Sequence, residues 1–352
     1  MVSWQAHWPE EIWNDMQIKK IGTKEVTTFP NLQPSLYHTL VCSANQFGEK
    51  TAIIDNWNRN YSFSSFLQMV DQFASYIHAK NRIKKGSHIG LMMYNSIEFC
   101  VAFLALNKLG AVAVPLPVKY KKQEVLSLAK KADISYVICD EKYADWFKSD
   151  EAGQIPCIQS VDSENKYGFA YFLLNDLPQA DAAGNFEDPA IIIFTSGTTS
   201  KSKGVLLKNY NMMHAILAYQ RTLDITEQDK TIIPIPIYLV TGMIALLGLF
   251  LHVGGTVYLH KFFDAKRVLQ CAAEQKITFF HASPTVFTLL LEESINFPKI
   301  PSLRSFACGS SNMPPENIRR IKQWLPQADF HTVYGLTETS SPATILPIGA
   351  AD

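Results

Sequence analysis

The sequence has no excess charge of either sign and no pattern of cysteine or histidine that marks a metal site. Its 32 Lys and Arg residues balance 32 Asp and Glu residues, so nothing favours a polyanionic partner such as nucleic acid. The six cysteines include no Cys-x-x-Cys pair, and the nine histidines show no His-Glu-x-x-His spacing. These absences leave a zinc site without support, and they favour reduced thiols in a cytoplasmic protein.

A secretory signal is also lacking, because no basic segment followed by an apolar one stands at the N-terminus. The longest uncharged run, Thr231 to Leu259, is long enough to cross a bilayer. Two prolines near its start and the pair Gly254-Gly255 divide this run. We therefore expect a strand, a buried helix and a second strand, at 231–237, 240–252 and 256–260. Contact with a membrane would be peripheral at most.

Outside that run, helical and strand patterns alternate along the 352 residues. Several apolar stretches with helical spacing begin after a capping residue such as Ser35 and end at a glycine. The expected helices are 36–47, 64–77, 97–109, 121–131, 209–221, 284–294 and 315–324. The expected strands are 88–93, 111–116, 134–139, 190–195, 205–207, 277–280, 303–307 and 328–333. This alternation predicts an α/β fold with mostly parallel sheets and helices on both faces.

One expected strand ends in a segment whose composition suits phosphate binding. After Phe194 come ten small, hydroxylated or basic residues, among them Thr195, Ser196, Gly197, Thr198, Thr199 and Lys203. Backbone N–H groups in tight turns, hydroxyls and ammonium groups together bind phosphates. The segment is not a Walker A loop, because Ser202 stands where that motif needs its second glycine. A solvated loop has the same composition, so a second motif is needed before nucleotide binding is indicated.

The expected strand 328–333 supplies that second motif, Tyr334 to Thr339. A threonine hydroxyl at Thr337 can donate to a phosphate oxygen, and the carboxylate of Glu338 can hold the Mg²⁺ that neutralises a polyphosphate. Tyr334 can stack on a purine. On its own, the segment is equally an ordinary turn after a strand. Because ligands of open parallel sheets bind beyond the carboxyl ends of strands, the two segments together predict a polyphosphate site.

These two motifs, some 130 residues apart, resemble those of the adenylate-forming superfamily. This superfamily includes acyl-CoA synthetases, adenylation domains of peptide synthetases and luciferases. Further segments are similar to the superfamily's patterns, namely 60–63, 107–116 and 308–314, so the resemblance covers the chain from about Pro34. It implies an α/β fold of two mostly parallel sheets in an αβαβα arrangement. The chain would be the large N-terminal domain, residues 1–352, with subdomains near 34–185 and 186–345.

Carried over residue by residue, the resemblance implies contacts with every part of ATP. The β- and γ-phosphates would be wrapped by Thr195, Ser196, Gly197, Thr198, Thr199 and Lys203. Adenine would lie along Gly309, Ser310 and Ser311 and stack on Tyr334. Thr337 would touch the α-phosphate and Glu338 would bind Mg²⁺, which makes Thr337, Glu338 and Lys203 the expected catalytic residues. Gly335, beside the nucleotide, would also face the acyl group, together with Tyr238, Leu239, Thr241 and Gly242.

The departures from the superfamily's pattern bear on affinity and on substrate choice. Ser200 and Ser202 stand where glycine and proline are usual. Because a serine adopts a positive φ only at a cost in energy, closure of this loop or the affinity for ATP would be altered. Amino-acid-activating relatives place an aspartate at the position of Leu239. Leucine cannot pair with an ammonium group, and an unpaired buried charge is costly. The substrate implied is therefore an uncharged, apolar fatty or aryl acid.

The reaction implied has two steps. A carboxylate attacks the α-phosphorus of ATP to give an acyl-adenylate and pyrophosphate, and the thiol of coenzyme A then displaces AMP. A carboxylate is already ionised at pH 7, so the first step needs no general base. It needs two anions to be positioned and their charge to be offset. The cofactors and co-substrates would be ATP, Mg²⁺ and coenzyme A, with a small-molecule carboxylate and no nucleic acid.

The resemblance also implies later segments that are not in this sequence, among them a Tyr-x-Thr-Gly-Asp motif and a C-terminal lid domain with a lysine. We therefore expect the N-terminal part of a longer enzyme, weakly active or inactive alone. Two alternatives stay open at this point. One is an enzyme that loads an amino acid or fatty acyl group onto a carrier protein, and the other is a non-catalytic nucleotide- or acyl-binding module. Acyl chain length and oligomeric state are not set by the sequence.

Overall fold

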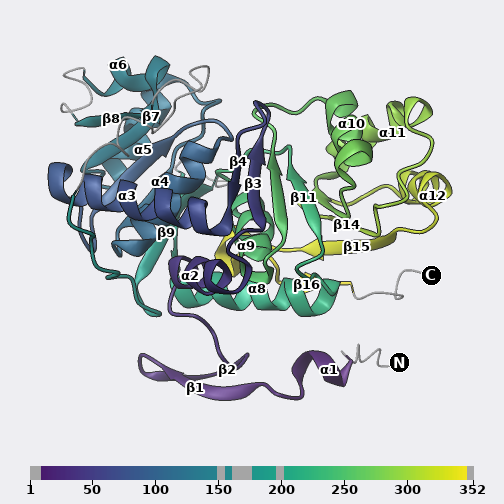
Figure 1. Cartoon of the computed structure of the whole chain (residues 1–352), viewed down its shortest axis with the longest axis horizontal. Coiled ribbons are helices and arrows are strands. Elements are labelled where there is room, and N and C mark those ends of the chain that lie inside the picture. The colour runs from purple at the N-terminus through teal and green to yellow at the C-terminus, as the bar shows by residue number, and fades with distance from the viewer. Residues whose placement is uncertain (1–8, 149–154, 161–176, 196–201, 347–352) are drawn as a thin grey trace.

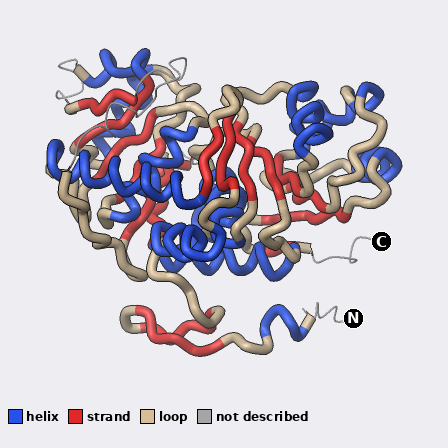
Figure 2. The backbone as a smooth tube through the Cα atoms, in the orientation of Figure 1, coloured by secondary structure: helices blue, strands red, loops and turns tan. Residues whose placement is uncertain are grey.

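The computed structural model describes residues 9–148, 155–160, 177–195 and 202–346. Within them, two large sheets stand side by side (Figures 1 and 2). The six-stranded sheet has the order β10-β9-β6-β5-β7-β8. Its strands are β5 (His88–Met92), β6 (Val112–Pro115), β7 (Tyr136–Asp140), β8 (Cys157–Ser160), β9 (Pro189–Thr195) and β10 (Lys203–Lys208). All neighbours are parallel except β9 and β10, which form an antiparallel hairpin.

The eight-stranded sheet has the order β16-β15-β14-β13-β11-β12-β3-β4. Its strands are β3 (Thr51–Asp55), β4 (Asn60–Ser62), β11 (Lys230–Ile233), β12 (Thr256–Leu259), β13 (Phe279–Ala282), β14 (Ser305–Cys308), β15 (Asp329–Tyr334) and β16 (Thr344–Ile345). The six central strands are parallel, and β4 and β16 add antiparallel edges. A separate hairpin, β1 (Gln17–Ile21) and β2 (Lys24–Thr28), follows the short helix α1 (Glu10–Trp13).

Three hydrophobic cores separate the layers, as expected for an αβαβα arrangement. The central core takes residues from both sheets and from the helices between them. These helices are α2 (Leu36–Phe47), α3 (Phe63–Asn81), α4 (Ile97–Lys108), α8 (Asn209–Leu223), the π-helix η3 (Thr241–Gly248) and α9 (Leu249–Val253). All twelve residues of α4 are buried, so this helix lacks the polar face of a surface helix.

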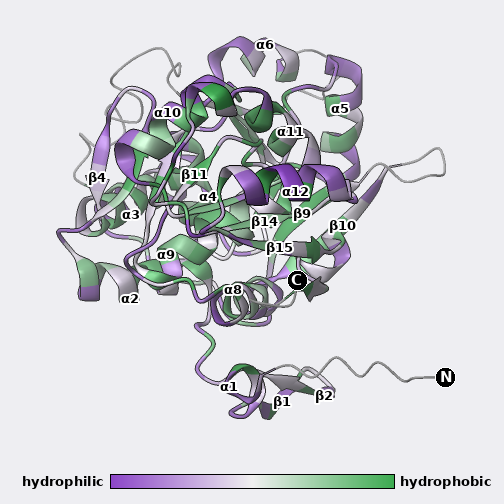
Figure 3. Cartoon of the chain, turned by 90° about the vertical axis from the view of Figure 1, so that its right-hand side faces the viewer, coloured by the Kyte–Doolittle hydropathy of each residue, from purple (hydrophilic) through white to green (hydrophobic). Residues whose placement is uncertain are grey.

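The two outer cores cover the remaining sheet faces. On the eight-stranded sheet lie α10 (Ala265–Gln275), α11 (Pro284–Glu292) and α12 (Pro315–Trp324), and on the six-stranded sheet lie α5 (Lys122–Lys131) and α6 (Ala144–Phe147). Figure 3 shows the hydrophilic side of α12 turned outward. Short turns of 3-10 helix are η1 (Glu141–Tyr143), η4 (Ser294–Asn296) and η5 (Thr337–Thr339). The α/β class and the layered fold predicted from the sequence are therefore confirmed.

The proline-rich end of β11 differs from the expected strand. The expectation was a strand to residue 237, but β11 ends at Ile233, because Pro234 and Pro236 have no N–H to donate to a ladder. The expected helix 240–252 forms as η3 followed by α9, and it ends at Gly254 with φ +78°. None of the helices in the described parts of the chain is both long and apolar enough to cross a membrane.

Other boundaries also moved. The helix expected from residue 64 begins at Phe63, because the Oγ of Ser62 accepts the N–H of Ser65 and caps it. Helix α10 and the strands β1 to β3 were not expected, whereas β4 falls in the segment 60–63 whose resemblance implied a short strand. Sheet membership does not follow the boundary near 185/186: β9 and β10 belong to the sheet of β5–β8, whereas β3 and β4 join the later strands. The two halves of the chain are thus interlocked.

Candidate nucleotide and acyl site

The strand that follows the first predicted phosphate motif packs against the turn that carries the second. Thr195 ends β9, and its Cα partner in the hairpin is Lys203 at the start of β10. Strand β10 packs against the turn η5, which carries Thr337 and Glu338. Ser196, Gly197, Thr198, Thr199 and Ser200 lie outside the described residues. Strand β10 and the second motif are therefore adjacent, although they are far apart in the sequence.

The charged side chains at this junction are open to solvent. Lys203 and Glu338 are exposed, Thr195 and Thr337 are half-buried, and the Tyr334 ring is 61% exposed. Among the described residues, no group of three or more His, Cys, Asp and Glu side chains forms a metal cluster. Mg²⁺ binds one or two carboxylates and completes its shell with water and phosphate oxygens, so the exposed carboxylate of Glu338 could hold this ion. A cleft of about 320 Å³ between β2, α8 and residues 338–345 borders Glu338.

Two glycines near this turn stand where the neighbouring backbone leaves little room for a side chain. Gly309 follows β14 and Gly335 follows the neighbouring parallel strand β15. A Cβ on Gly309 would stand 2.9 Å from the carbonyl oxygen of Val333, and one on Gly335 would stand 3.3 Å from the backbone at Ser341 and Ala343. Ser310, with φ 73°, and Ser311 are exposed at the tip. The predicted adenine turn and the predicted Thr-Glu turn therefore lie side by side.

We expect Gly309→Ala to destabilise the fold by about 1–3 kcal/mol, because the new methyl would overlap a backbone oxygen that belongs to a sheet strand and cannot move freely. The measurement is urea unfolding of the purified chain. Gly86→Ala is the contrasting variant, since a Cβ there meets nothing within 4 Å but its φ is +79°, so that it reports backbone strain without a contact. If Gly309→Ala unfolds at the same urea concentration as wild type, the contact with Val333 is relieved without cost and the expectation is wrong.

The predicted acyl segment lies before and within η3. Tyr238 is buried, Leu239 is 44% exposed, Thr241 is half-buried and Gly242 is buried. Burial, followed by the nearby Tyr120 and Tyr94, raises the pKa of Tyr238, so its hydroxyl stays protonated. Gly242 has no room for a side chain, because a Cβ would stand 2.6 Å from the Cα of Ile237. Helix η3 packs against β11 and β13, next to the strands that end in the two glycine turns.

Asn95, which the sequence did not single out, holds this segment in place. It follows β5 of the six-stranded sheet and is buried. Its amide nitrogen donates to the carbonyl oxygens of Ile233 (3.2 Å), Ile235 (2.7 Å) and His260 (2.9 Å), and its oxygen accepts the N–H of Ile237 at 2.8 Å. One side chain thus replaces the ladder bonds that the prolines interrupt. No local sequence signal could reveal a partner some 140 residues away.

Two further side chains lie beneath the glycine turns. His281 on β13 is buried with 3% of its surface exposed, and its Nε2 is 3.6 Å from the point where a Cβ on Gly309 would stand. Tyr219 on α8 is fully buried and donates or accepts a hydrogen bond of 2.8 Å with the Oγ of Ser341, beside Gly335. The sequence showed only a lone histidine and a helical tyrosine here, and both fit an ordinary core.

Open α/β sheets bind their ligands beyond the carboxyl ends of the strands, where the candidate turns of this domain lie. The chain belongs to the AMP-binding enzyme family, whose model matches residues 41–352.

Among curated relatives, it is 28% identical over 312 residues to a 2-succinylbenzoate–CoA ligase of Bacillus velezensis, covering 87% of this chain and 60% of the relative. It is 26% identical over 317 residues to a medium-chain fatty-acid–CoA ligase of Escherichia coli, covering 86% of this chain and 55% of the relative. The chain thus spans little more than half the length of these relatives.

Among solved structures, the inhibitor-bound N-terminal domain of FACL13 from Mycobacterium tuberculosis superposes with a TM-score of 0.81 at 23% identity, covering 91% of this chain and 80% of that one. The o-succinylbenzoate CoA synthetase of Bacillus subtilis in complex with an acyl-adenylate gives a TM-score of 0.77 at 24% identity, with coverages of 90% and 61%. Both likenesses confirm the fold.

Proposed function

We propose that this chain binds ATP with Mg²⁺ at the junction of β10 and η5. There it takes part in activating a carboxylic acid as an acyl-adenylate, and coenzyme A is the thiol that accepts the acyl group. The observation that supports the proposal is the packing of β10, the strand that follows the first motif, against η5, the turn that carries Thr337 and Glu338. Family membership supports the reaction class.

Each of these residues has a role that its chemistry allows. The ammonium of Lys203 and the hydroxyl of Thr195 would hold the outer phosphates, together with the loop 196–201. Thr337 would donate to the α-phosphate, and Glu338 would hold Mg²⁺. Such groups offset the repulsion between a carboxylate and a triphosphate and position the two for in-line attack, which is the main demand of this chemistry. The chain's own residues would thus supply charge and orientation and no base.

The acyl group would enter between Tyr238–Gly242 and the glycines at 309 and 335. Leu239 is partly exposed and has no charge to offer, so an uncharged and largely apolar acid fits better than an amino acid. The names of the relatives point the same way, since they include ligases for medium-chain fatty acids and for 2-succinylbenzoate.

We expect Glu338→Gln to weaken binding of ATP in the presence of MgCl₂ about tenfold, because the carboxylate that contacts the ion is lost, and to leave binding of ATP in EDTA nearly unchanged. Isothermal titration calorimetry of the purified chain measures both. Glu292→Gln, an exposed glutamate on α11, is the matched control. If the two variants behave alike, Glu338 is not the Mg²⁺ ligand, and if the wild-type chain does not bind ATP, the proposed function fails.

A further inference from the structure

A second cleft lies between the β3–β4 turn, the end of β12 and helix α10, and its volume is about 440 Å³. It borders the outer face of the eight-stranded sheet, because Tyr258 pairs with Ile54 across β12 and β3 and both pack in the core beneath α10. Its lining shares no residue with the cleft beside Glu338 and includes none of the predicted ATP, Mg²⁺ or acyl residues. Clefts of this size bind small molecules.

The lining of this outer cleft is rich in groups that can both donate and accept a hydrogen bond. Five of its side chains are amides, namely Asn56, Asn58, Asn60, Gln270 and Gln275. The imidazole of His260 and the hydroxyl of Tyr258 add two groups of the same dual capacity. A hydroxyl group is also both a donor and an acceptor, so a ligand with several hydroxyls can use both halves of these groups, whereas a simple ion can use only one.

His260, at the end of β12, adds an observation that points to a ligand. This lining residue is only 7% exposed, and its Nδ1 has no hydrogen-bond partner within the described parts of the chain. Burial, followed by the charge of Arg267, lowers the pKa of His260 to about 4, so the ring is neutral at pH 7. A buried polar atom without a partner is unfavourable and calls for one.

The charges around the outer cleft do not favour an ionic ligand. The lining holds two carboxylates, Asp55 and Glu274, and one guanidinium, Arg267. Asp55 is buried and forms an ion pair of 2.6 Å with Arg59, and Glu274 accepts a hydrogen bond of 2.8 Å from Gln270. A strongly anionic ligand would meet these carboxylates, and a cation would meet Arg267. The balance of charge therefore suits an uncharged molecule.

Hydrogen bonds within the protein hold the walls of the outer cleft in place. Oδ1 of Asn56 in the β3–β4 turn accepts the N–H of Lys261 at 2.7 Å, which joins this turn to the segment after β12. The hydroxyl of Tyr258 donates to Oε1 of Gln275 at 3.1 Å, which joins β12 to the end of α10. Walls that are already ordered reduce the entropy cost of binding.

We propose that the outer cleft binds an uncharged ligand with several neighbouring hydroxyl groups, of the size of a mono- or disaccharide. The amides of Asn60 and Gln270 would bond hydroxyls at the rim, and the imidazole of His260 would bond one at the base. Two sources share this chemistry, namely a free sugar and the sugar of a nucleoside. Because the cleft shares no residue with the proposed ATP site, this proposal stands or fails independently of the proposed function.

The test follows the imidazole signals of the purified chain, labelled with ¹⁵N-histidine, by NMR, and the His260 signal is identified by its absence from His260→Gln. The probes are D-glucose, maltose and uridine, the last with excess AMP to occupy a nucleotide site elsewhere. Sodium sulfate and tetrahydropyran-2-methanol, which has the ring of glucose but one hydroxyl, are the comparison ligands. We expect at least one probe to shift the His260 signal with a dissociation constant on the order of 1 mM. A shift with uridine alone identifies a nucleoside as the source, and a shift with glucose or maltose alone identifies a free sugar.

Variants at the rim test the proposed contacts. Gln270→Ala and Asn60→Ala, both at exposed positions, should each weaken binding about fivefold, because each loses one amide that bonds the ligand. Gln323→Ala, at an exposed glutamine on α12, is the matched control, and the remaining histidine signals show whether each variant keeps the fold. The proposal is overturned if no probe shifts the His260 signal below about 50 mM. It is also overturned if a comparison ligand shifts the signal as strongly as the probes, or if Gln270→Ala and Gln323→Ala bind alike.

Discussion

Asp71→Ala should lower the free energy of unfolding by about 3–5 kcal/mol, because it leaves a buried cation without its partner. Lys108 at the end of α4 is only 1% exposed, and its Nζ donates to Oδ1 of Asp71 at 2.8 Å. The same carboxylate oxygen accepts the hydroxyl of Tyr37 at 2.8 Å. Burial, with Asp71 adding to it, raises the pKa of Tyr37, so this hydroxyl remains a donor.

The network continues through neighbouring amides and ties four helices together. Asn107 accepts the N–H of Tyr37 at 2.8 Å and donates to Asn209 at 2.8 Å. These contacts join α2, α3, α4 and the start of α8 in the central layer. Asn107 and Lys108 belong to the segment 107–116, which carried part of the sequence resemblance. In the structure, their side chains hold these helices together.

Urea unfolding measures the effect of Asp71→Ala, with Asp181→Ala at an exposed aspartate as the matched control. The double variant with Lys108→Met removes the buried charge as well, and it should recover most of the lost stability. If Asp71→Ala unfolds at the same urea concentration as Asp181→Ala, or if the double variant is less stable than the single one, the ion pair does not act in this way.

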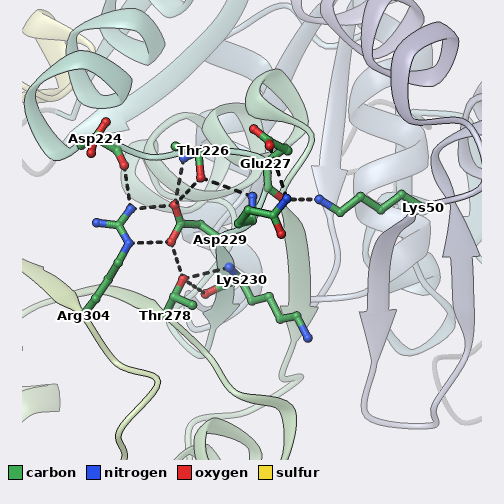
Figure 4. A network of polar contacts seen from close by, with 9 residues as sticks. Lys50, Asp224, Thr226, Glu227, Asp229, Lys230, Thr278 and Arg304 are labelled. Atoms are coloured by element: carbon green, nitrogen blue, oxygen red, sulfur yellow. Dashed lines mark hydrogen bonds and ion pairs between the residues drawn. The ribbon is translucent and has the colours of Figure 1, made fainter.

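Asp229→Asn should cost about 2 kcal/mol at pH 7, and the cost should vanish in acid. Asp229 is 3% exposed and accepts five hydrogen bonds, shown in Figure 4. The donors are Nε and one terminal nitrogen of Arg304 (2.8 and 2.6 Å), Oγ1 of Thr278 (2.6 Å), and the N–H and Oγ1 of Thr226 (2.8 and 3.3 Å). Lys50, just before β3, donates to the carbonyl oxygen of Glu227 in the same loop.

The sign of the pH effect follows from the pKa of Asp229. Burial by itself would raise this pKa, but the hydrogen bonds from Arg304 and Thr278 outweigh burial and hold the pKa below its usual value. A carboxyl whose pKa is depressed in the folded state stabilises the fold above its unfolded pKa of about 3.9, and that contribution is lost as the pH falls through the folded pKa. Asparagine cannot ionise, so it gives up only the contribution that depends on the charge.

Urea unfolding of wild type and Asp229→Asn at pH 7 and at several values below pH 4 provides the measurement. The difference between the two proteins should shrink steadily through the acid range. Asp181→Asn, exposed and remote, should match wild type at pH 7. The difference in free energy of unfolding between wild type and Asp229→Asn could instead stay constant down to the lowest pH at which the chain folds. That result would mean that the charge of Asp229 does not cause the difference.

The sequence predicted the elements whose signals are local. Ser35 precedes α2 and Gly48 follows it, as the capping pattern indicates, and the strand pattern at 190–195 matches β9 closely. The approximate place of the phosphate motifs at strand ends was also predictable, because it follows from alternating strands and helices. The length of β11 was not predictable, because the side chain of Asn95 completes the backbone hydrogen bonds after Pro234.

The candidate site was predictable only in part. Glycines and hydroxyls mark the loops, but the roles of Thr195, Ser196, Gly197, Thr198 and Thr199 stay predictions. The side chains beneath the glycine turns left no sequence signal, because His281 and Tyr219 look like core residues until the contacts of Tyr219 with His281 and Ser341 are seen. A pattern records what one residue does next to its neighbours in the chain, and these contacts are made across 60 or more residues.

By itself, the sequence determined the family, the α/β class and the residue types available for phosphate, since these depend on local periodicity and on short motifs. Only the tertiary structure decided that β9 and β10 belong to the first sheet, that β10 meets η5, and that Asp71 and Asp229 accept the bonds of distant cations. The reason is physical: burial makes an unpaired polar group costly, and the partner that satisfies it is chosen by proximity in the folded chain and not by order along it.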